Sequence, residues 1–92
     1  MNTQLNYHHL RYFLAVATSG GITQAAAAIH VSSPTLSTQL KELETFVGKT
    51  LFRRENRRMR LTEDGRLLLR YAERIFATGD EMVEVIKRGK TA

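Results

Sequence analysis

Residues 31–40, Val-Ser-Ser-Pro-Thr-Leu-Ser-Thr-Gln-Leu, concentrate small hydroxyl side chains in one short segment. At about 100° per residue, a helix here sets Leu36 and Leu40 on one side and the small polar groups on the other. Hydroxyl groups donate and accept hydrogen bonds, and a threonine methyl can contact the methyl group of thymine. We therefore predict a helix that enters the major groove of DNA, the alternative being an ordinary surface helix. The DNA-contacting candidates are Ser33, Pro34, Thr35, Ser37, Thr38 and Lys41.

Arginines are unusually dense between positions 53 and 60, where five of them share eight positions with Glu55 as the only acidic residue. Like charges this close repel one another, and a solvated turn, the alternative interpretation, gives no reason to collect them. Insertion of arginine into a narrow minor groove of DNA does give such a reason. The candidates for contacts with the DNA backbone and minor groove are Arg53, Arg54, Arg57 and Arg58.

Catalytic chemistry has little support in this sequence. His8, His9 and His30 lie apart from any pair of carboxylates, and no residues show the spacing of metal ligands. The chain contains no cysteine, which excludes disulfides and thiolate zinc sites and is typical of a reducing compartment. We therefore expect no catalytic residue, no cofactor and no metal, and we do not expect an enzyme.

The 92 residues are enough for one small domain with a modest core, for which dimerisation is a natural supplement. A formal net charge of +5 and an isoelectric point of about 10.1 favour a polyanionic partner. No apolar run approaches the ~20 residues of a membrane span, and the first four residues do not resemble a signal peptide. We expect a soluble, cytoplasmic, nucleoid-associated protein without a membrane partner.

Two helices are predicted before the hydroxyl-rich segment. Asn6 can cap a first helix that ends at the glycine pair 20–21. A shorter second helix is predicted over 23–29, where four successive alanines allow helices to approach closely. A tight turn at 30–32 then leads to the third helix.

The third helix has a clear start and a clear end. Ser33 is a good N-cap, with Pro34 at the first helical position, where its missing N–H costs nothing. Together with the helix before it, this element forms a helix-turn-helix pattern. Gly48 ends the helix, whose apolar stripe consists of Leu36, Leu40, Leu43 and Val47.

The arginine-rich segment is predicted to form a small β-hairpin, or wing. Leu51–Arg54 and Met59–Leu61 are short extended runs on either side of a polar tip at 55–58. The wing would project from the helical core and carry the arginine cluster with it.

Thr62 is predicted to cap a long final helix of about twenty-five residues, which at ~1.5 Å per residue is close to 38 Å long. This rod is longer than the core that it would lean on, so its half from Ile75 to Ile86 needs an apolar partner. A second copy of the chain is the simplest partner, and a helix that bends or frays at Gly79 is the alternative. The dimer-interface candidates are Leu68, Tyr71, Ala72, Ile75, Gly79, Met82, Val83 and Ile86.

One combination of residues spans nearly the whole chain: Phe13, Ala25-Ala26, Ile29 to Leu40, Leu43-Glu44, Gly48, Leu51 to Arg54, Leu61-Thr62 and Gly65. It resembles the N-terminal domain of LysR-type transcriptional regulators. Within that family, the branch of the sodium/proton antiporter activator is similar at Asn6-Tyr7, His9-Leu10, Thr35, Arg70-Tyr71-Ala72 and Glu81-Met82.

The resemblance implies a winged helix-turn-helix followed by a linker helix that joins two DNA-binding domains. It also implies a C-terminal domain of two α/β lobes that binds a small-molecule effector, which these residues do not contain, and it allows a tetramer of the whole regulator.

For the third helix, the resemblance implies contacts of Ser33, Pro34, Thr35 and Thr38 with bases, and of Ser37 with the backbone. It places the wing arginines in or beside the minor groove. The sequence departs from the family at Ser33, where glutamine is usual, and at Thr38, where arginine is frequent. Because both residues are shorter here, we expect weaker direct base recognition at an inverted-repeat promoter site.

The sequence thus predicts a mostly α-helical protein, with a winged helix-turn-helix over 1–61, a dimerising linker helix over 62–88 and a frayed tail over 89–92. We expect a homodimer that binds double-stranded DNA through two successive major grooves, as the DNA-binding part of a transcription regulator. Two alternatives stay open. One is a winged-helix domain of another bacterial regulator, such as the molybdate-responsive type. The other is a helical dimerisation module whose basic loop binds an acidic protein or a membrane surface.

Overall fold

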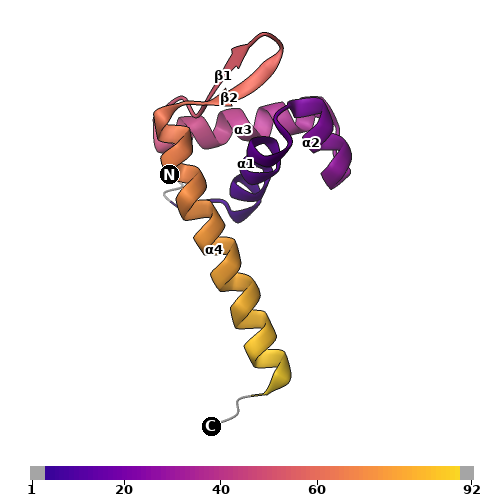
Figure 1. Cartoon of the computed structure of the whole chain (residues 1–92), viewed down its shortest axis with the longest axis vertical. Helices are drawn as coiled ribbons and strands as arrows, with labels where there is room; N and C mark the ends of the chain where they lie inside the picture. The colour runs from indigo at the N-terminus through magenta and orange to yellow at the C-terminus, as the bar shows by residue number, and fades with distance from the viewer. Residues whose placement is uncertain (1–3, 90–92) are drawn as a thin grey trace.

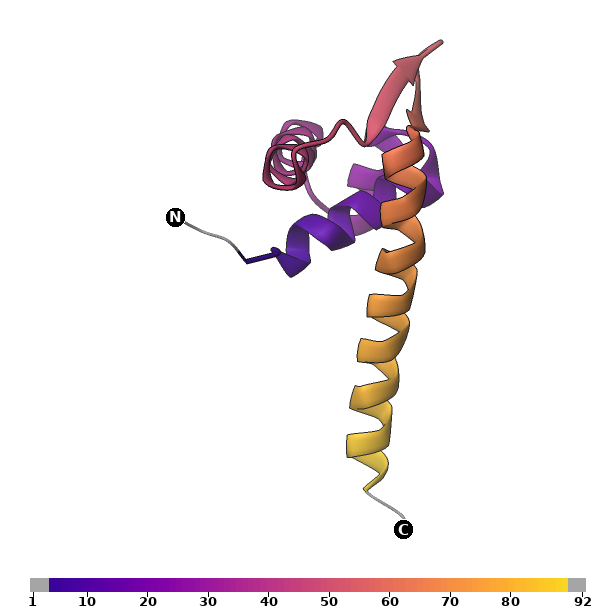
Figure 2. The same ribbon diagram turned by 90° about the vertical axis from the view of Figure 1, so that its left-hand side faces the viewer.

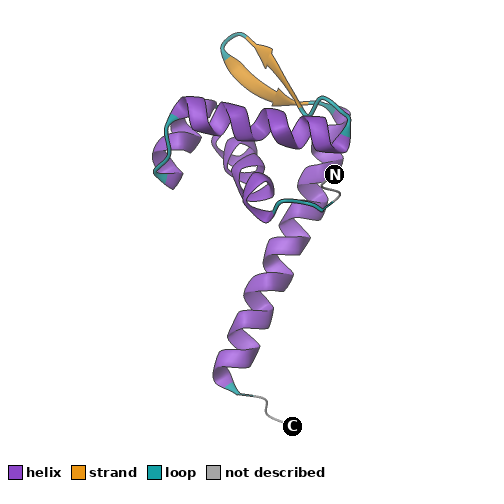
Figure 3. Ribbon diagram, turned by 180° about the vertical axis from the view of Figure 1, so that it is seen from behind, coloured by secondary structure: helices purple, strands orange, loops and turns teal. Residues whose placement is uncertain are grey.

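Four helices and one β-hairpin follow one another along the chain, and the computed structural model describes them within residues 4–89. The hairpin stands above α3, and α4 extends away from the other helices as a rod (Figures 1 and 3). This arrangement confirms the predicted mostly helical winged helix-turn-helix. The elements are α1 (Tyr7–Ser19), α2 (Ile22–Ile29), α3 (Ser33–Val47), β1 (Phe52–Glu55), β2 (Arg58–Leu61) and α4 (Glu63–Arg88).

The caps of α1 explain its bounds. The Asn6 side chain accepts hydrogen bonds from the backbone N–H groups of His8 and His9, at 2.8 and 3.2 Å. At the other end, Gly20 adopts a left-handed conformation with φ 81°, which glycine reaches without steric cost. The predicted cap and the predicted end of the first helix are both confirmed.

The start of α3 differs from the prediction by one residue. Ser32, not Ser33, is the N-cap, because its hydroxyl accepts a hydrogen bond from the Thr35 N–H at 3.2 Å. The turn after α2 is completed at His30, in the left-handed region with φ 61°, so the chain is already extended at Ser32. Ser33 is therefore the first helical residue and Pro34 the second, where the N–H group still has no partner within the helix.

The wing is tighter than the sequence indicates. Its strands pair antiparallel from Phe52–Leu61 at the root to Glu55–Arg58 at the end, so the loop contains only Asn56 and Arg57. Both loop residues have positive φ, 49° and 66°, as expected for a two-residue turn of type I′. The predicted four-residue tip is wrong, because Glu55 and Arg58 form the last pair of the ladder.

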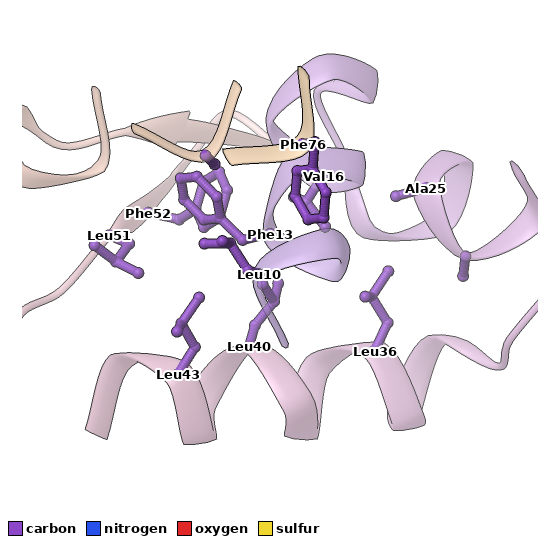
Figure 4. Close-up of a cluster of buried hydrophobic side chains, with 12 residues drawn as sticks. Leu10, Phe13, Val16, Ala25, Leu36, Leu40, Leu43, Leu51, Phe52 and Phe76 are labelled. Carbon is purple, nitrogen blue, oxygen red and sulfur yellow. The ribbon is translucent and has the colours of Figure 1, made fainter. Parts of the chain in front are cut away.

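The hydrophobic core lies between α1, α3, the wing root and the first half of α4. From α1, Phe13 is fully buried, and its ring lies 5.2 Å from that of Phe52 (Figure 4). The predicted stripe of α3 faces this core through Leu36, Leu40 and Leu43. Because these leucines fill one side of α3, its hydroxyl-bearing side is left on the surface.

The rod α4 is divided by its packing. Up to Gly79 it is part of the domain, since Phe76 is only 5% exposed and contacts the ring of Tyr7 at 4.7 Å between centroids. Beyond Gly79, all residues from 80 to 88 are exposed, and Figure 2 shows this last part of the helix clear of the other helices. Among residues 4–89, no helix has the length and apolar character that crossing a membrane requires. Of the predicted tail, residues 90–92 lie outside the described part of the chain.

Candidate nucleic-acid interface

The outer face of α3 presents the polar side chains that the sequence singled out. Ser37, Thr38 and Lys41 are exposed, and together with Glu42 and Thr45 they line a shallow depression. Pro34 and Thr35 are exposed near the start of the helix, whereas Ser33 is half-buried. The predicted candidates therefore share one accessible surface except for Ser33, which is partly covered.

The carboxylate on this face has a partner in α1. Glu42 Oε1 lies 3.2 Å from Nε2 of His9, whose side chain is mostly buried. Nε2 donates a hydrogen bond to the carboxylate if it carries a proton, and the contact becomes an ion pair if the ring is protonated at both nitrogens. This contact engages Glu42 beside Lys41, so the carboxylate is not a free negative charge on the α3 face.

The wing arginines do not form a single cluster. Paired residues of an antiparallel ladder lie on the same side of it, so Arg53, Arg60, Glu55 and Arg58 share one face. On that face, Arg60 Nε contacts Glu55 Oε1 at 3.2 Å. Arg54 lies on the opposite face, paired with Met59, and Arg57 is in the loop. The four predicted arginines are all exposed but point in different directions.

Arg54 meets α3 across a groove of about 250 Å³, which we call the wing groove. Arg54 and Lys41 bring positive charge to it from two different elements, and Ser37 adds a hydroxyl. Its residues are Ile22, Ser37, Leu40, Lys41, Glu44, Phe52, Arg54 and Met59. The wing groove therefore joins the predicted recognition helix and the wing into one surface.

Sequence reasoning assigned no role to Glu44, yet it fixes the wing to α3. Its Oε2 accepts hydrogen bonds from the backbone N–H groups of Leu51 and Phe52, at 2.8 and 3.3 Å. From the other side, Thr62 donates its N–H to the Leu51 carbonyl at 3.0 Å and its hydroxyl to the Thr50 carbonyl at 2.7 Å. The wing root is therefore tied to α3 and to α4 at once.

The predicted dimer residues fall into different environments. Tyr71, Ile75, Met82, Val83 and Ile86 are exposed, and Leu68 is half-buried. Ala72 has no exposed surface, because this side of α4 packs into the core of the same chain, so a partner cannot contact it. A methyl group placed on Gly79 would lie 3.4 Å from the Tyr7 hydroxyl, so Gly79 also faces its own domain.

Two large exposed apolar residues of α4 were missing from the predicted set. Leu67 and Val85 lie one position away from predicted residues at the two ends of the helix. The predicted set included Ala72 and Gly79, which face the core of the same chain together with Phe76, and it omitted these two residues on the exposed side. The order of apolar residues along α4 does not by itself separate those that face the core from those that face away from it.

Comparison with known proteins decides the family. Residues 7–66 match the model of the bacterial regulatory helix-turn-helix proteins of the lysR family, a range that includes α3 and the wing. The chain belongs to the lysR family. This assignment excludes the alternative of a winged helix from another type of regulator, and residues of α4 beyond 66 lie outside the matched range.

Relatives of the chain are named as transcription regulators. It is 40% identical over 91 residues to a "Probable RuBisCO transcriptional regulator" of Trieres chinensis. This match covers 99% of this chain and 29% of the relative. It is 33% identical over 88 residues to the "Transcriptional activator protein NhaR" of Escherichia coli (strain K12), covering 96% of this chain and 29% of the relative. The chain thus spans less than a third of the length of these relatives.

A solved lysR-type domain has the same fold. The crystal structure of BenM_DBD in complex with benA site 1 DNA superposes with a TM-score of 0.87 at 34% sequence identity. The match covers 91% of this chain and 98% of the other. The similarity extends beyond residue 66, so the long helix belongs to the shared fold as well.

Proposed function

We propose that this chain binds double-stranded DNA as a homodimer and is the DNA-binding part of a LysR-type transcription regulator. The observation that carries the proposal is the wing groove, where Lys41 and Arg54 lie beside the exposed hydroxyls of α3. The carboxylate in this groove, Glu44, is occupied by two backbone N–H groups. The groove therefore presents positive charge and hydrogen-bonding groups, which suits a polyanion.

In this proposal α3 enters the major groove and the wing follows the adjacent backbone and minor groove. Thr38 and Lys41 lie on the side of α3 away from the leucines, Ser37 lies on its flank toward the wing groove, and Arg57 stands at the wing tip. Solved DNA complexes of a lysR-type domain with this fold support the placement. We assign DNA contact to residues within 1–61 and dimerisation to 62–88.

The exposed residues of α4 support an antiparallel dimer. Leu67 and Ile86, Tyr71 and Met82, and Ile75 and Thr78 are each equidistant from a point between residues 76 and 77. A two-fold axis at that point would pair each residue with its counterpart on the partner helix. We call this set the α4 seam: Leu67, Tyr71, Ile75, Thr78, Met82 and Ile86.

The charges at the two ends of α4 also favour an antiparallel arrangement of the two helices. The first turn of α4 contains Glu63 and Asp64, and its last turn contains Lys87 and Arg88. Antiparallel helices bring the acidic start of one beside the basic end of the other, whereas parallel helices would bring like charges together. An antiparallel partner would therefore cover the α4 seam with its own copy and place the acidic start of one α4 beside the basic end of the other.

This dimer also sets the two copies of α3 apart by a distance of the same order as one turn of DNA. The end of α3 meets α4 near Leu67 and Leu68, about nine residues from the two-fold point, so the two ends lie roughly 27 Å apart along the rods. In Figure 2, α3 is seen end-on to one side of α4, so a two-fold axis along that direction, perpendicular to the rod, leaves both copies of α3 on the same side of the paired rods. Successive major grooves on one side of DNA are about 34–36 Å apart.

Binding to a labelled pool of random-sequence duplex DNA at increasing salt tests the proposal. We expect the affinity to fall by about 10³-fold or more between 50 and 200 mM salt, because six or more phosphate contacts release that many counterions. Absence of DNA binding, together with binding to anionic vesicles or to an acidic protein, would favour the alternative of a basic module with another partner. Selection of tight binders from the same pool would then give the operator sequence.

A further inference from the structure

One acidic side chain lies on the face of α3 that the proposed function directs at the major groove. Glu42 lines the shallow depression of this face, about 450 Å³ in volume, together with Ser37, Thr38, Lys41 and Thr45. The residues from Thr38 to Thr45 in this set follow the spacing i, i+3, i+4, i+7, so they project from one side of the helix. Phosphates on both edges of a DNA groove repel a carboxylate, so an acid at this position needs a reason.

Stability does not supply that reason. The contact of Glu42 Oε1 with His9 Nε2, at 3.2 Å, leaves 55% of the Glu42 side chain exposed. A contact made by so exposed a carboxylate adds little to the free energy of unfolding, because water competes for both groups. What the contact does is fix the direction in which the carboxylate points.

His9 is a firm support for this carboxylate. Its side chain is only 13% exposed, and its backbone N–H donates to the Asn6 side chain at 3.2 Å in the cap of α1. The contact uses Oε1 of Glu42, so Oε2 keeps its capacity to accept a hydrogen bond from a ligand. A side chain held in this way loses less conformational entropy when it binds a base.

The chemistry of a carboxylate differs from that of the other side chains in the depression. Hydroxyl groups donate or accept and lysine only donates, whereas an ionised Glu42 only accepts. In the major groove, guanine and thymine present acceptors, and adenine presents the acceptor N7 beside its amino group. Cytosine presents its N4 amino group without an acceptor beside it, so a carboxylate at the base edges favours cytosine.

We infer that Glu42 accepts a hydrogen bond from the N4 amino group of a cytosine in each half-site, and that His9 positions Glu42 for this contact. The inference rests on the proposed function, because it requires α3 to lie in the major groove. It gives α3 a contact that distinguishes between bases about one turn beyond Thr38, whose hydroxyl can either donate or accept.

Selection from a random pool of duplex DNA tests the inference. We expect the sites selected by the unaltered chain to contain cytosine at one position of each half-site. Glu42→Gln should replace this cytosine with adenine, because a glutamine amide can bond both N6 and N7 of adenine. Glu84→Gln is the matched control, since it removes the same charge from an exposed position of α4 and should keep the cytosine.

The outcomes separate this inference from the proposed function. Selected sites without such a cytosine, or with a cytosine that Glu42→Gln leaves in place, would overturn the role of Glu42 but not DNA binding. The same change in Glu84→Gln would also overturn it, because charge rather than contact would then set the preference. A chain that binds no DNA at all would overturn the proposed function itself.

A change in the DNA tests the same contact with the protein unaltered. Pyrimidin-2-one in place of the selected cytosine lacks only the 4-amino group. This replacement should weaken binding of the unaltered chain about fivefold more than it weakens binding of Glu42→Ala, because only the former loses a base contact. Equal losses for the two proteins would contradict a hydrogen bond from that amino group to Glu42.

The positioning role of His9 has its own test. His9→Gln keeps a side-chain N–H that can donate to Glu42 and should retain the preference for cytosine. His9→Leu fills a similar volume without a donor and should lose most of this preference, while its affinity for random-sequence DNA stays the same. Loss of the preference in both variants, or in neither, would show that the contact with Glu42 does not set it.

Discussion

The hydroxyl groups of α3 are not equivalent. Thr35 belongs to the helix cap, since its N–H donates to the Ser32 hydroxyl and its own hydroxyl accepts from Ser32 at 2.8 Å. The Thr38 hydroxyl makes no hydrogen bond within the described residues, and the side chain lies on the exposed face one turn further along. Among the short side chains of this helix, Thr38 is therefore the better candidate for a base contact.

Thr38→Ala should weaken binding to a selected operator by about 1 kcal/mol, or roughly fivefold, while binding to random DNA stays nearly constant. The physical reason is the loss of one hydroxyl and one methyl contact with a base edge. Anisotropy titrations with both kinds of DNA measure the difference, with Thr45→Ala at the far end of the same face as the control. Equal losses on both kinds of DNA would show that Thr38 only positions the helix.

Glu44 gives a second prediction for a single residue. Glu44→Ala should lower the free energy of unfolding by about 1–3 kcal/mol, because it leaves the N–H groups of Leu51 and Phe52 without their acceptor in a part-buried site. Glu42→Ala, which removes an exposed carboxylate from the same helix, should cost less than about 1 kcal/mol. Urea unfolding measures both values, and a loss at Glu42 as large as that at Glu44 would contradict this role.

At the scale of elements, the helices were largely predictable because local signals determine where they begin and end. Asn6, Gly20, Gly48 and Thr62 cap helices as their residue types indicate. Ser32 and Ser33 are equally good caps by type, and only the left-handed conformation of His30 decides between them.

The wing was less predictable. Which arginine faces α3 depends on how the strands pair and which side of the hairpin packs on the helix, and the short runs do not show that Glu55 and Arg58 extend the ladder by one pair. The role of Glu44 depends on a contact seven residues away in sequence, which no local pattern encodes.

The wing also carries a prediction of its own. The double variant Arg57→Ala with Arg58→Ala should reduce the slope of log affinity against log salt by about 1–2, because each lost phosphate contact removes close to one unit. Arg60→Ala is the matched control, since Arg60 already contacts Glu55 at 3.2 Å and should change the slope less. An unchanged slope in the double variant would mean that the wing tip does not contact DNA.

At the scale of the whole molecule, α4 has two stripes with different tasks. Ala72 and Phe76 face the core, and Tyr71 and Ile75 face away from it. The molecule is 52 Å long but only 30 and 24 Å in its other dimensions, because the last third of the rod extends past the domain. In a single chain the apolar residues of this segment, among them Met82 and Ile86, stay exposed, and the proposed partner would cover them.

Ile75→Glu tests the dimer at the centre of the α4 seam. Because residue 75 is close to the two-fold point, the two copies of residue 75 lie near each other, so two carboxylates would be buried together and the dimer should dissociate. Ala77→Glu adds the same charge at an exposed position outside the seam and should leave the dimer intact. Sedimentation equilibrium gives the mass of both variants. A dimeric Ile75→Glu would place the interface elsewhere, whereas two monomeric variants would mean that added charge alone separates the chains.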